Sequence, residues 1–244
     1  GLRKRGIGVD ATRVAEGSEA APDAKATVYR QDSPFSLAQL IYETNAGSDN
    51  FYAEHLLKTL GAEFGQEGSF DEGIRSVRHA LSMLEIPLTG FAQMDGSGLA
   101  RAKGAGNLAS PRTVVALLRA MAQHPRGVQF VSSLAVAGVS GTIERRFDEP
   151  PLRGRVYAKT GKINGSMTLS GFLVHETVPV AAFSILANFE GEGTFALHRT
   201  IYQFQDDALK AAWAHLQATN QRWSTPPALV SANDARDPDA SAIE

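Results

Sequence analysis

Apolar positions in the first half of the chain recur at the spacing of amphipathic helices. A helix is predicted to open at Ser33, a good N-cap that is followed by a proline in the first turn. A second helix is predicted to begin at Ser48 and to stop at Gly61. Two more are predicted over roughly 70–85 and from a serine-proline pair through 110–123.

In the second half of the chain, apolar residues recur with the two-residue period of β-strands. Residues 154–159 alternate as a half-buried strand does, and further strands are predicted near 166–175 and 179–188. The last of these is mostly apolar, which predicts a central place in the sheet. A short strand is also predicted at 90–94. A long helix at about 194–218 is expected to pack on the sheet through Leu197, Ile201, Phe204 and Trp213. Helices, then antiparallel strands and a closing helix, indicate an α+β fold.

Composition narrows the class of protein. The chain has 244 residues, of which 43% are hydrophobic and 20% charged, as in ordinary globular domains. Its net charge of −2 argues against a nucleic-acid partner. The lack of cysteine excludes disulfides, thiolate metal sites and cysteine nucleophiles. We expect a connector at the start of a fragment over 1–27, a folded part over 28–220 and a disordered tail over 221–244.

Two short motifs carry candidate chemistry. Lys159-Thr160-Gly161 lies on a predicted strand, where a lysine is equally consistent with a solvated strand end. Ser48-Asp49-Asn50 lies at a predicted helix start, where all three residue types are favoured whatever the function. The pair is more specific than either motif, because S-D-N and K-T-G accompany S-x-x-K in penicillin-recognising serine enzymes. The two motifs stand here in that order.

A third stretch, Met94 to Arg101, reads MDGSGLAR and predicts a tight turn with glycines on both sides of Ser97. It is not a nucleophile elbow, because G-x-S-x-G would need glycine where Asp95 and Leu99 stand.

Five segments, in order along the chain, resemble one family. They are SPFSLAQLIYETNAGSDNFYAEHLLKTLG, DGSGLAR, SPRTVVALLRAM, LAVAGVSGTIERRF and VYAKTGKINGSMTLSGFL. Together they are similar to the D-alanyl-D-alanine carboxypeptidase/endopeptidase family of class C low-molecular-mass penicillin-binding proteins, from about residue 28 to 215. The resemblance implies a penicillin-binding-protein/β-lactamase-like transpeptidase fold and action on peptidoglycan stem peptides through an acyl-enzyme. It also implies covalent inhibition by β-lactams, a periplasmic or cell-envelope location, and no cofactor.

The resemblance gives each motif residue a role. Ser48 would relay a proton to the leaving amine, and Asn50 would hold the S-x-x-K lysine and contact the substrate amide. Lys159 would attract the terminal carboxylate, Thr160 would donate a hydrogen bond to it, and Gly161 would let the substrate backbone lie against the strand.

Two further positions are less specific. Arg101 is a candidate partner for a carboxylate on the stem-peptide side chain, with an ordinary surface salt bridge as the alternative. Asp49 is expected to cap its helix and to point away from the chemistry. The six histidines lack metal-site spacing such as HExxH, so no metal is predicted.

One part of the family's machinery is missing from the sequence. The nucleophile of these enzymes is the serine of S-x-x-K, and no serine of this chain has a lysine three positions later. We favour a C-terminal fragment, whose partner would be the missing N-terminal part of the same protein. An inactive peptide- or β-lactam-binding module and a β-lactamase-like hydrolase of another amide or ester are the alternatives. The 244 residues alone are predicted to be inactive.

Overall fold

The computed structural model of the protein describes residues 33–99 and 106–219. Arg101, the predicted connector at 1–27 and the predicted tail at 221–244 therefore lie outside the described residues. The elements below all lie within residues 36–219.

Within the described residues, five α-helices precede the main strands: α1 (Leu37–Asn45), α2 (Asn50–Phe64), α3 (Phe70–Met83), α4 (Pro111–Gln123) and α5 (Gly127–Ser132). The prediction that a helix opens at Ser33 is wrong by three residues. Ser36 is the N-cap of α1, and Ser36 and Gln39 form a capping box in which each side chain accepts from the other residue's backbone N–H. For α4 the prediction is confirmed, with Ser110 as the N-cap and the proline in the first turn.

The second predicted helix is corrected at both ends. Its N-cap is Asp49, whose carboxylate accepts from the Tyr52 N–H at 2.9 Å, and not Ser48. The helix also continues past Gly61 to Phe64. A Cβ on Gly61 would lie 2.9 Å from the backbone nitrogen of Gly73 in α3. Gly61 therefore allows α2 and α3 to pack closely and does not end α2.

The sheet has four antiparallel strands in the order β1 (Ala135–Val136), β2 (Val156–Ile163), β3 (Ser166–His175) and β4 (Val178–Asn188). The three longer strands confirm the prediction, but β4 is an edge strand and β3 is central. β4 is apolar because helices cover both its faces: Ala181 and Phe183 pack against one core cluster and Ala182 against the other. The predicted strand at 90–94 is wrong, since only one isolated bridge joins Ala92 to Leu108.

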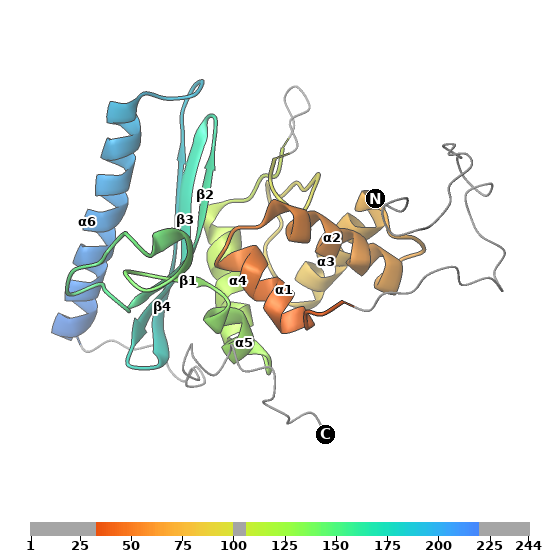
Figure 1. Ribbon diagram of the computed structural model, residues 1–244, viewed down its shortest axis with the longest axis horizontal. Coiled ribbons are helices and arrows are strands. Elements are labelled where there is room, and N and C mark those ends of the chain that lie inside the picture. Colours follow the sequence, from red (N-terminus) through yellow and green to blue (C-terminus); the bar gives the residue numbers. More distant parts are fainter. Residues whose placement is uncertain (1–32, 100–105, 220–244) are drawn as a thin grey trace, which may run out of the picture. The chain divides into compact units, whose positions relative to one another are not determined.

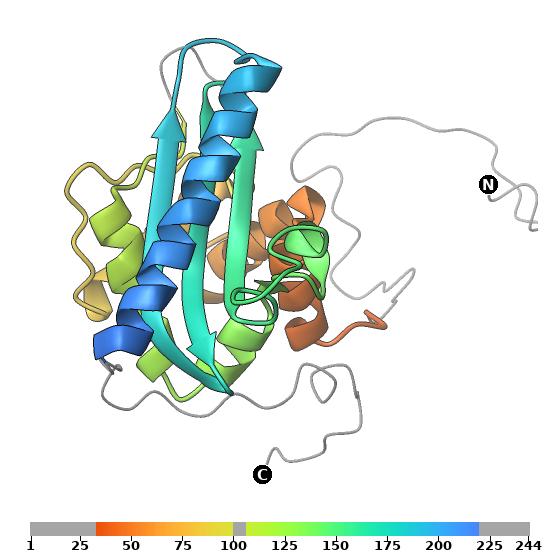
Figure 2. The same ribbon diagram turned by 90° about the vertical axis from the view of Figure 1, so that its left-hand side faces the viewer.

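Helices lie on both faces of this sheet (Figures 1 and 2). α6 (Phe195–Thr219) lies along one face, and α4 and α5 lie on the other. The face of α6 toward the sheet carries its buried residues, Ile201, Gln205, Leu209 and Trp213. Phe204 was predicted to pack there but is 61% exposed. The fold is α+β, and no helix in the described ranges is long and apolar enough to span a membrane.

Candidate active site

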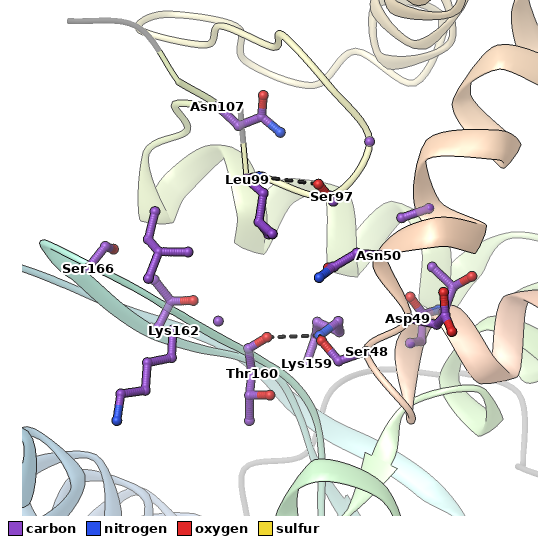
Figure 3. Close-up of a pocket in the computed structure, with 18 of the residues that line it drawn as sticks. Ser48, Asp49, Asn50, Ser97, Leu99, Asn107, Lys159, Thr160, Lys162 and Ser166 are labelled. Carbon is purple, nitrogen blue, oxygen red and sulfur yellow. Dashed lines mark hydrogen bonds between the residues drawn. The ribbon is translucent and has the colours of Figure 1, made fainter. Parts of the chain in front are cut away.

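The two sequence motifs line one cleft of about 760 Å³ (Figure 3). The start of α2 contributes Ser48, Asp49 and Asn50, and the end of β2 contributes Lys159 and the residues that follow it. A third wall comes from the DGSG turn and Asn107. The juxtaposition of the SDN and KTG motifs that the sequence predicted is therefore found.

Lys159 and Ser48 are in direct contact across the cleft. The Lys159 Nζ donates to Ser48 Oγ at 2.7 Å and to the Thr160 carbonyl at 2.9 Å. Both partners are uncharged, and burial lowers the pKa of Lys159 below its usual value, because desolvation disfavours the ammonium. An ammonium has three N–H donors, so these two bonds leave one for a ligand.

Ser48 is held in an unusual backbone conformation. Its φ of 59° lies in the left-handed region, which residues other than glycine adopt rarely. Such strain persists where the surroundings fix it, and it is concentrated at functional sites. Asn50 is directed into the cleft, whereas Asp49 is turned toward its own helix (Figure 3). The expectation that Asp49 caps the helix is confirmed, although Asp49 also lines the cleft.

The edge of β2 beyond Ala158 is not covered by β1, which pairs only with Tyr157 and Ala158. The Val156 carbonyl accepts from the Ala137 N–H on the β1 side. Because backbone groups alternate along an antiparallel strand, the N–H and C=O groups of Thr160 and Lys162 face the same side. An extended peptide can therefore pair with this edge.

Gly161 makes the strand fit its neighbour in the sheet. A Cβ on Gly161 would lie 2.4 Å from Thr168 Oγ1 on β3. From the sequence, Gly161 was expected to let the substrate backbone lie close to the strand. In the structure, the missing Cβ also leaves room for the Thr168 side chain on β3.

The 3-10 turn Gly141–Ile143 (η3) bonds both to β2 and to the residue that follows α1. Thr160 Oγ1 donates to Thr142 Oγ1 at 2.9 Å, and the Thr142 N–H donates to the carbonyl of Ala46 at 3.1 Å. Gly141, at φ 67°, leaves no room for a Cβ, which would lie 2.6 Å from that same carbonyl. Thr142 was not identified from the sequence, although it stands in the segment LAVAGVSGTIERRF.

The third wall is fixed by a carboxylate of α2. Glu54 accepts from the Gly96 N–H at 2.8 Å, from the Ser97 N–H at 3.2 Å and from the Ser97 hydroxyl. Asp95, which is buried, accepts from the Gly98 N–H at 2.7 Å. The predicted tight turn is confirmed, with Gly98 at φ 81°. The role of Glu54 was missed, because a glutamate within a helix gives no sequence signal for a contact 42 residues away.

Two further expectations concern other ligands. No group of three or more histidine, aspartate or glutamate side chains in the described part of the chain is arranged to hold a metal. The role assigned to Arg101 stays a prediction, since Arg101 lies outside the described residues.

Comparisons with known proteins agree on one family. The model of the D-Ala-D-Ala carboxypeptidase 3 (S13) family matches residues 1–207. A D-alanyl-D-alanine carboxypeptidase of Actinomadura sp. is 35% identical over 168 residues, which are 67% of this chain and 30% of that protein. The D-alanyl-D-alanine carboxypeptidase DacB of Haemophilus influenzae is 31% identical over 150 residues, 60% of this chain and 30% of that protein. The chain spans about a third of the length of the curated relatives it matches.

Solved structures show the same fold. Penicillin binding protein 4 (dacB) from Haemophilus influenzae in complex with a β-lactam gives a TM-score of 0.58 at 27% identity, over 70% of this chain and 40% of that one. A second structure of the same protein gives 0.56 at 30% identity, over 64% of this chain and 34% of that one.

Proposed function

The chain belongs to the D-Ala-D-Ala carboxypeptidase 3 (S13) family, and we propose that it supplies the substrate-binding half of a serine-type D-Ala-D-Ala carboxypeptidase/endopeptidase site. The substrate is a peptidoglycan stem peptide, cleaved through an acyl-enzyme, and β-lactams are covalent inhibitors of the complete site. The single observation that carries the proposal is the 2.7 Å bond from Lys159 Nζ to Ser48 Oγ, which brings the KTG and SDN motifs into one cleft. The place of action is the periplasm or cell envelope.

The substrate lies along the open edge of β2 in this proposal. The terminal carboxylate approaches the Lys159 ammonium, which has one donor left. It also approaches the Thr160 hydroxyl, which turns from Thr142 Oγ1 to donate to it. The backbone N–H of Lys162 faces the same side of the strand and is the donor for the oxyanion that develops at the scissile carbonyl. Asn50 presents an amide that can both donate to and accept from the peptide.

Ser48 acts as a proton relay. Because its Oγ accepts from Lys159, its own hydroxyl hydrogen is free to point into the cleft. As the scissile C–N bond breaks, Ser48 gives this proton to the leaving amine and is reprotonated by a neighbouring lysine ammonium. The bonding electrons stay with the amine nitrogen, and the acyl group stays on the nucleophile.

The nucleophile must come from outside these residues, because none of the 244 forms an S-x-x-K. The same observation favours a second candidate, a module that binds the peptide without cleaving it. The two candidates share the cleft and differ in whether an S-x-x-K serine completes it.

Binding of a short peptide that ends in D-Ala-D-Ala tests the shared part. We expect saturable binding to the chain, followed by NMR amide shifts, and weaker binding of the same peptide with a C-terminal carboxamide. Lys159→Ala should reduce affinity about tenfold, the effect of losing one charge-assisted hydrogen bond. Lys210→Ala, which removes an exposed lysine on α6, is the matched control. Equal affinity of the Lys159→Ala and Lys210→Ala variants would refute the proposed site.

A further inference from the structure

An exposed side of α6 carries two aromatic rings beside the end of β2. Phe195, at the start of the helix, is 84% exposed, and Tyr202 is 39% exposed. They are seven positions apart, so they share one side of the helix and lie about 10 Å apart along its axis. Tyr202 lines a small cavity together with Thr160 and Lys162, which places this side of α6 next to β2. Large apolar side chains gathered on one exposed face are typical of a binding surface.

The ring of Tyr202 is held in place by a neighbouring arginine. The Arg146 guanidinium lies 4.7 Å from the centre of the Tyr202 ring and 4.5 Å from that of Phe147. Arg146 is itself fixed, since its Nε donates to Asp206 Oδ1 at 2.9 Å and its Nη2 to the Tyr202 carbonyl at 3.2 Å. A side chain that is already ordered loses little conformational entropy when a ligand binds. Tyr202 is therefore a preorganised flat surface.

Hydrogen-bond donors lie close to the two rings. Arg199 is exposed and lies between Phe195 and Tyr202 on the same side of the helix, four residues after the first and three before the second. Lys162 is exposed at the end of β2 and lines the same small cavity as Tyr202. Aromatic rings with N–H donors between them suit a sugar chain, because a pyranose has an apolar C–H face and a rim of oxygen acceptors.

The spacing of the two rings fits a β-1,4-linked glycan. Two consecutive pyranose rings of such a chain span a length similar to two turns of an α-helix, which separate Phe195 from Tyr202. Alternate sugars of this chain also turn the same face to one side. One sugar can therefore stack on each aromatic ring, with the sugar between them opposite Arg199.

This side of α6 can be reached by a substrate that occupies the peptide cleft. In the proposed site the terminal carboxylate lies at Thr160 and the scissile carbonyl at the Lys162 N–H, so the preceding residues of the peptide continue toward the end of β2. That end is joined to the loop before α6, because the Asn164 Nδ2 donates to Glu192 Oε1 at 3.2 Å. In peptidoglycan the glycan is attached to the amino end of the stem peptide. A peptide in the cleft therefore brings its glycan to the end of the sheet at which α6 starts (Figure 2).

We propose that the side of α6 that carries Phe195, Arg199 and Tyr202 is a glycan subsite, which binds the β-1,4-linked amino-sugar chain that carries the stem peptide. Phe195 and Tyr202 each stack against the C–H face of one sugar, and Arg199 donates to the oxygens of the sugar between them. The choice of this glycan rests on the proposed function. Binding of a free sugar chain, however, does not require the peptide cleft.

The probe is chitotetraose, a β-1,4-linked tetramer of N-acetylglucosamine, titrated into the ¹⁵N-labelled chain. We expect saturable shifts of the Phe195, Arg199 and Tyr202 backbone amides. Phe195→Ala and Tyr202→Leu should each weaken binding about two- to tenfold, the effect of losing one aromatic contact, and Tyr202→Phe should retain it. Phe204→Ala is the matched control, because Phe204 is 61% exposed and lies on the opposite side of the same helix from Phe195.

Urea unfolding separates a loss of binding from a loss of fold. Phe195→Ala removes a side chain that is 84% exposed, so its unfolding midpoint should be unchanged. The subsite is overturned if no shift saturates, if Phe195→Ala and Phe204→Ala weaken binding equally, or if maltotetraose, whose α-1,4 bonds curve the chain, binds equally well. Chitotetraose binding without binding of the D-Ala-D-Ala peptide supports the subsite and contradicts the proposed function. Peptide binding without chitotetraose binding does the reverse.

Discussion

Removal of the Glu54 carboxylate should release the DGSG wall of the cleft from α2. Glu54 accepts two backbone N–H groups, at 2.8 and 3.2 Å, and the Ser97 hydroxyl. A hydrogen bond to a charged group contributes about 1.5–3 kcal/mol, and we use the low end because the glutamate is half-buried. Glu54→Ala should therefore lower the free energy of unfolding by about 3–4 kcal/mol, less than the sum of three separate bonds.

Urea unfolding of four variants measures this effect. Glu63→Ala, which removes an exposed glutamate on the same helix, should change stability by less than about 0.5 kcal/mol. Ser97→Ala removes one of the three bonds and should cost about 1 kcal/mol. In the double variant, Ser97→Ala should cost less than it does alone, because the bond shared with Glu54 is already lost and only the exposed bond from the Leu99 N–H to Ser97 Oγ remains to be removed. A Glu54→Ala loss no larger than that of Glu63→Ala would refute the reasoning.

Three further predictions concern β2 and its neighbours. When Thr160 turns to donate to the carboxylate, the Thr142 hydroxyl can donate to Thr160 Oγ1 in return and hold it in place. Thr142→Val removes this hydroxyl and should weaken binding of the D-Ala-D-Ala peptide severalfold in an NMR titration, with recovery in Thr142→Ser; unchanged affinity in the valine variant would contradict it. Burial lowers the pKa of Lys159, and only its ammonium form attracts a carboxylate. Peptide affinity should therefore be full below that pKa and fall as the pH rises through it, at a lower pH than for an exposed lysine. Lys159→Met should lose this pH-dependent fall, and a wild-type affinity that does not change with pH would contradict the prediction. Gly161→Ala should lower the free energy of unfolding in urea by about 1–3 kcal/mol, because its Cβ would lie 2.4 Å from Thr168 Oγ1. In a chain that also carries Thr168→Ala, most of this loss should disappear. Equal losses with and without Thr168→Ala would show that the clash is not the cause.

The sequence predicted those elements whose signals are local. The serine-proline start of α4 and the alternation of β2 and β3 could be read directly, because caps and strand periods depend on neighbouring residues. The pairing of two distant motifs followed from the family resemblance. β1 has two residues, too few for any period to appear.

The errors arose where tertiary contacts decide. Ser48, Asp49 and Asn50 are all good N-cap residues, so the sequence alone could not choose among them. In the structure, Ser48 has a left-handed backbone and contacts Lys159 across the cleft, and Asp49 caps α2. On α6, a pattern of apolar residues could not show that Gln205, rather than Phe204, faces the sheet. Adjacent helix positions differ by about 100° around the axis, so one wrong choice turns a residue from core to solvent.

Labelling with a fluorescent penicillin tests most directly whether the SDN and KTG cleft is part of a serine D,D-peptidase site. Acylation needs an activated serine, and the 244 residues contain no S-x-x-K. We therefore predict no covalent band on a denaturing gel from this chain, and a band from the same chain extended upstream through an S-x-x-K segment. In the extended chain, Lys159→Ala should reduce labelling more than Arg101→Ala does, and Lys210→Ala should leave it unchanged. A covalent band from the 244-residue chain, or full labelling of the extended Lys159→Ala variant, would contradict the assignment.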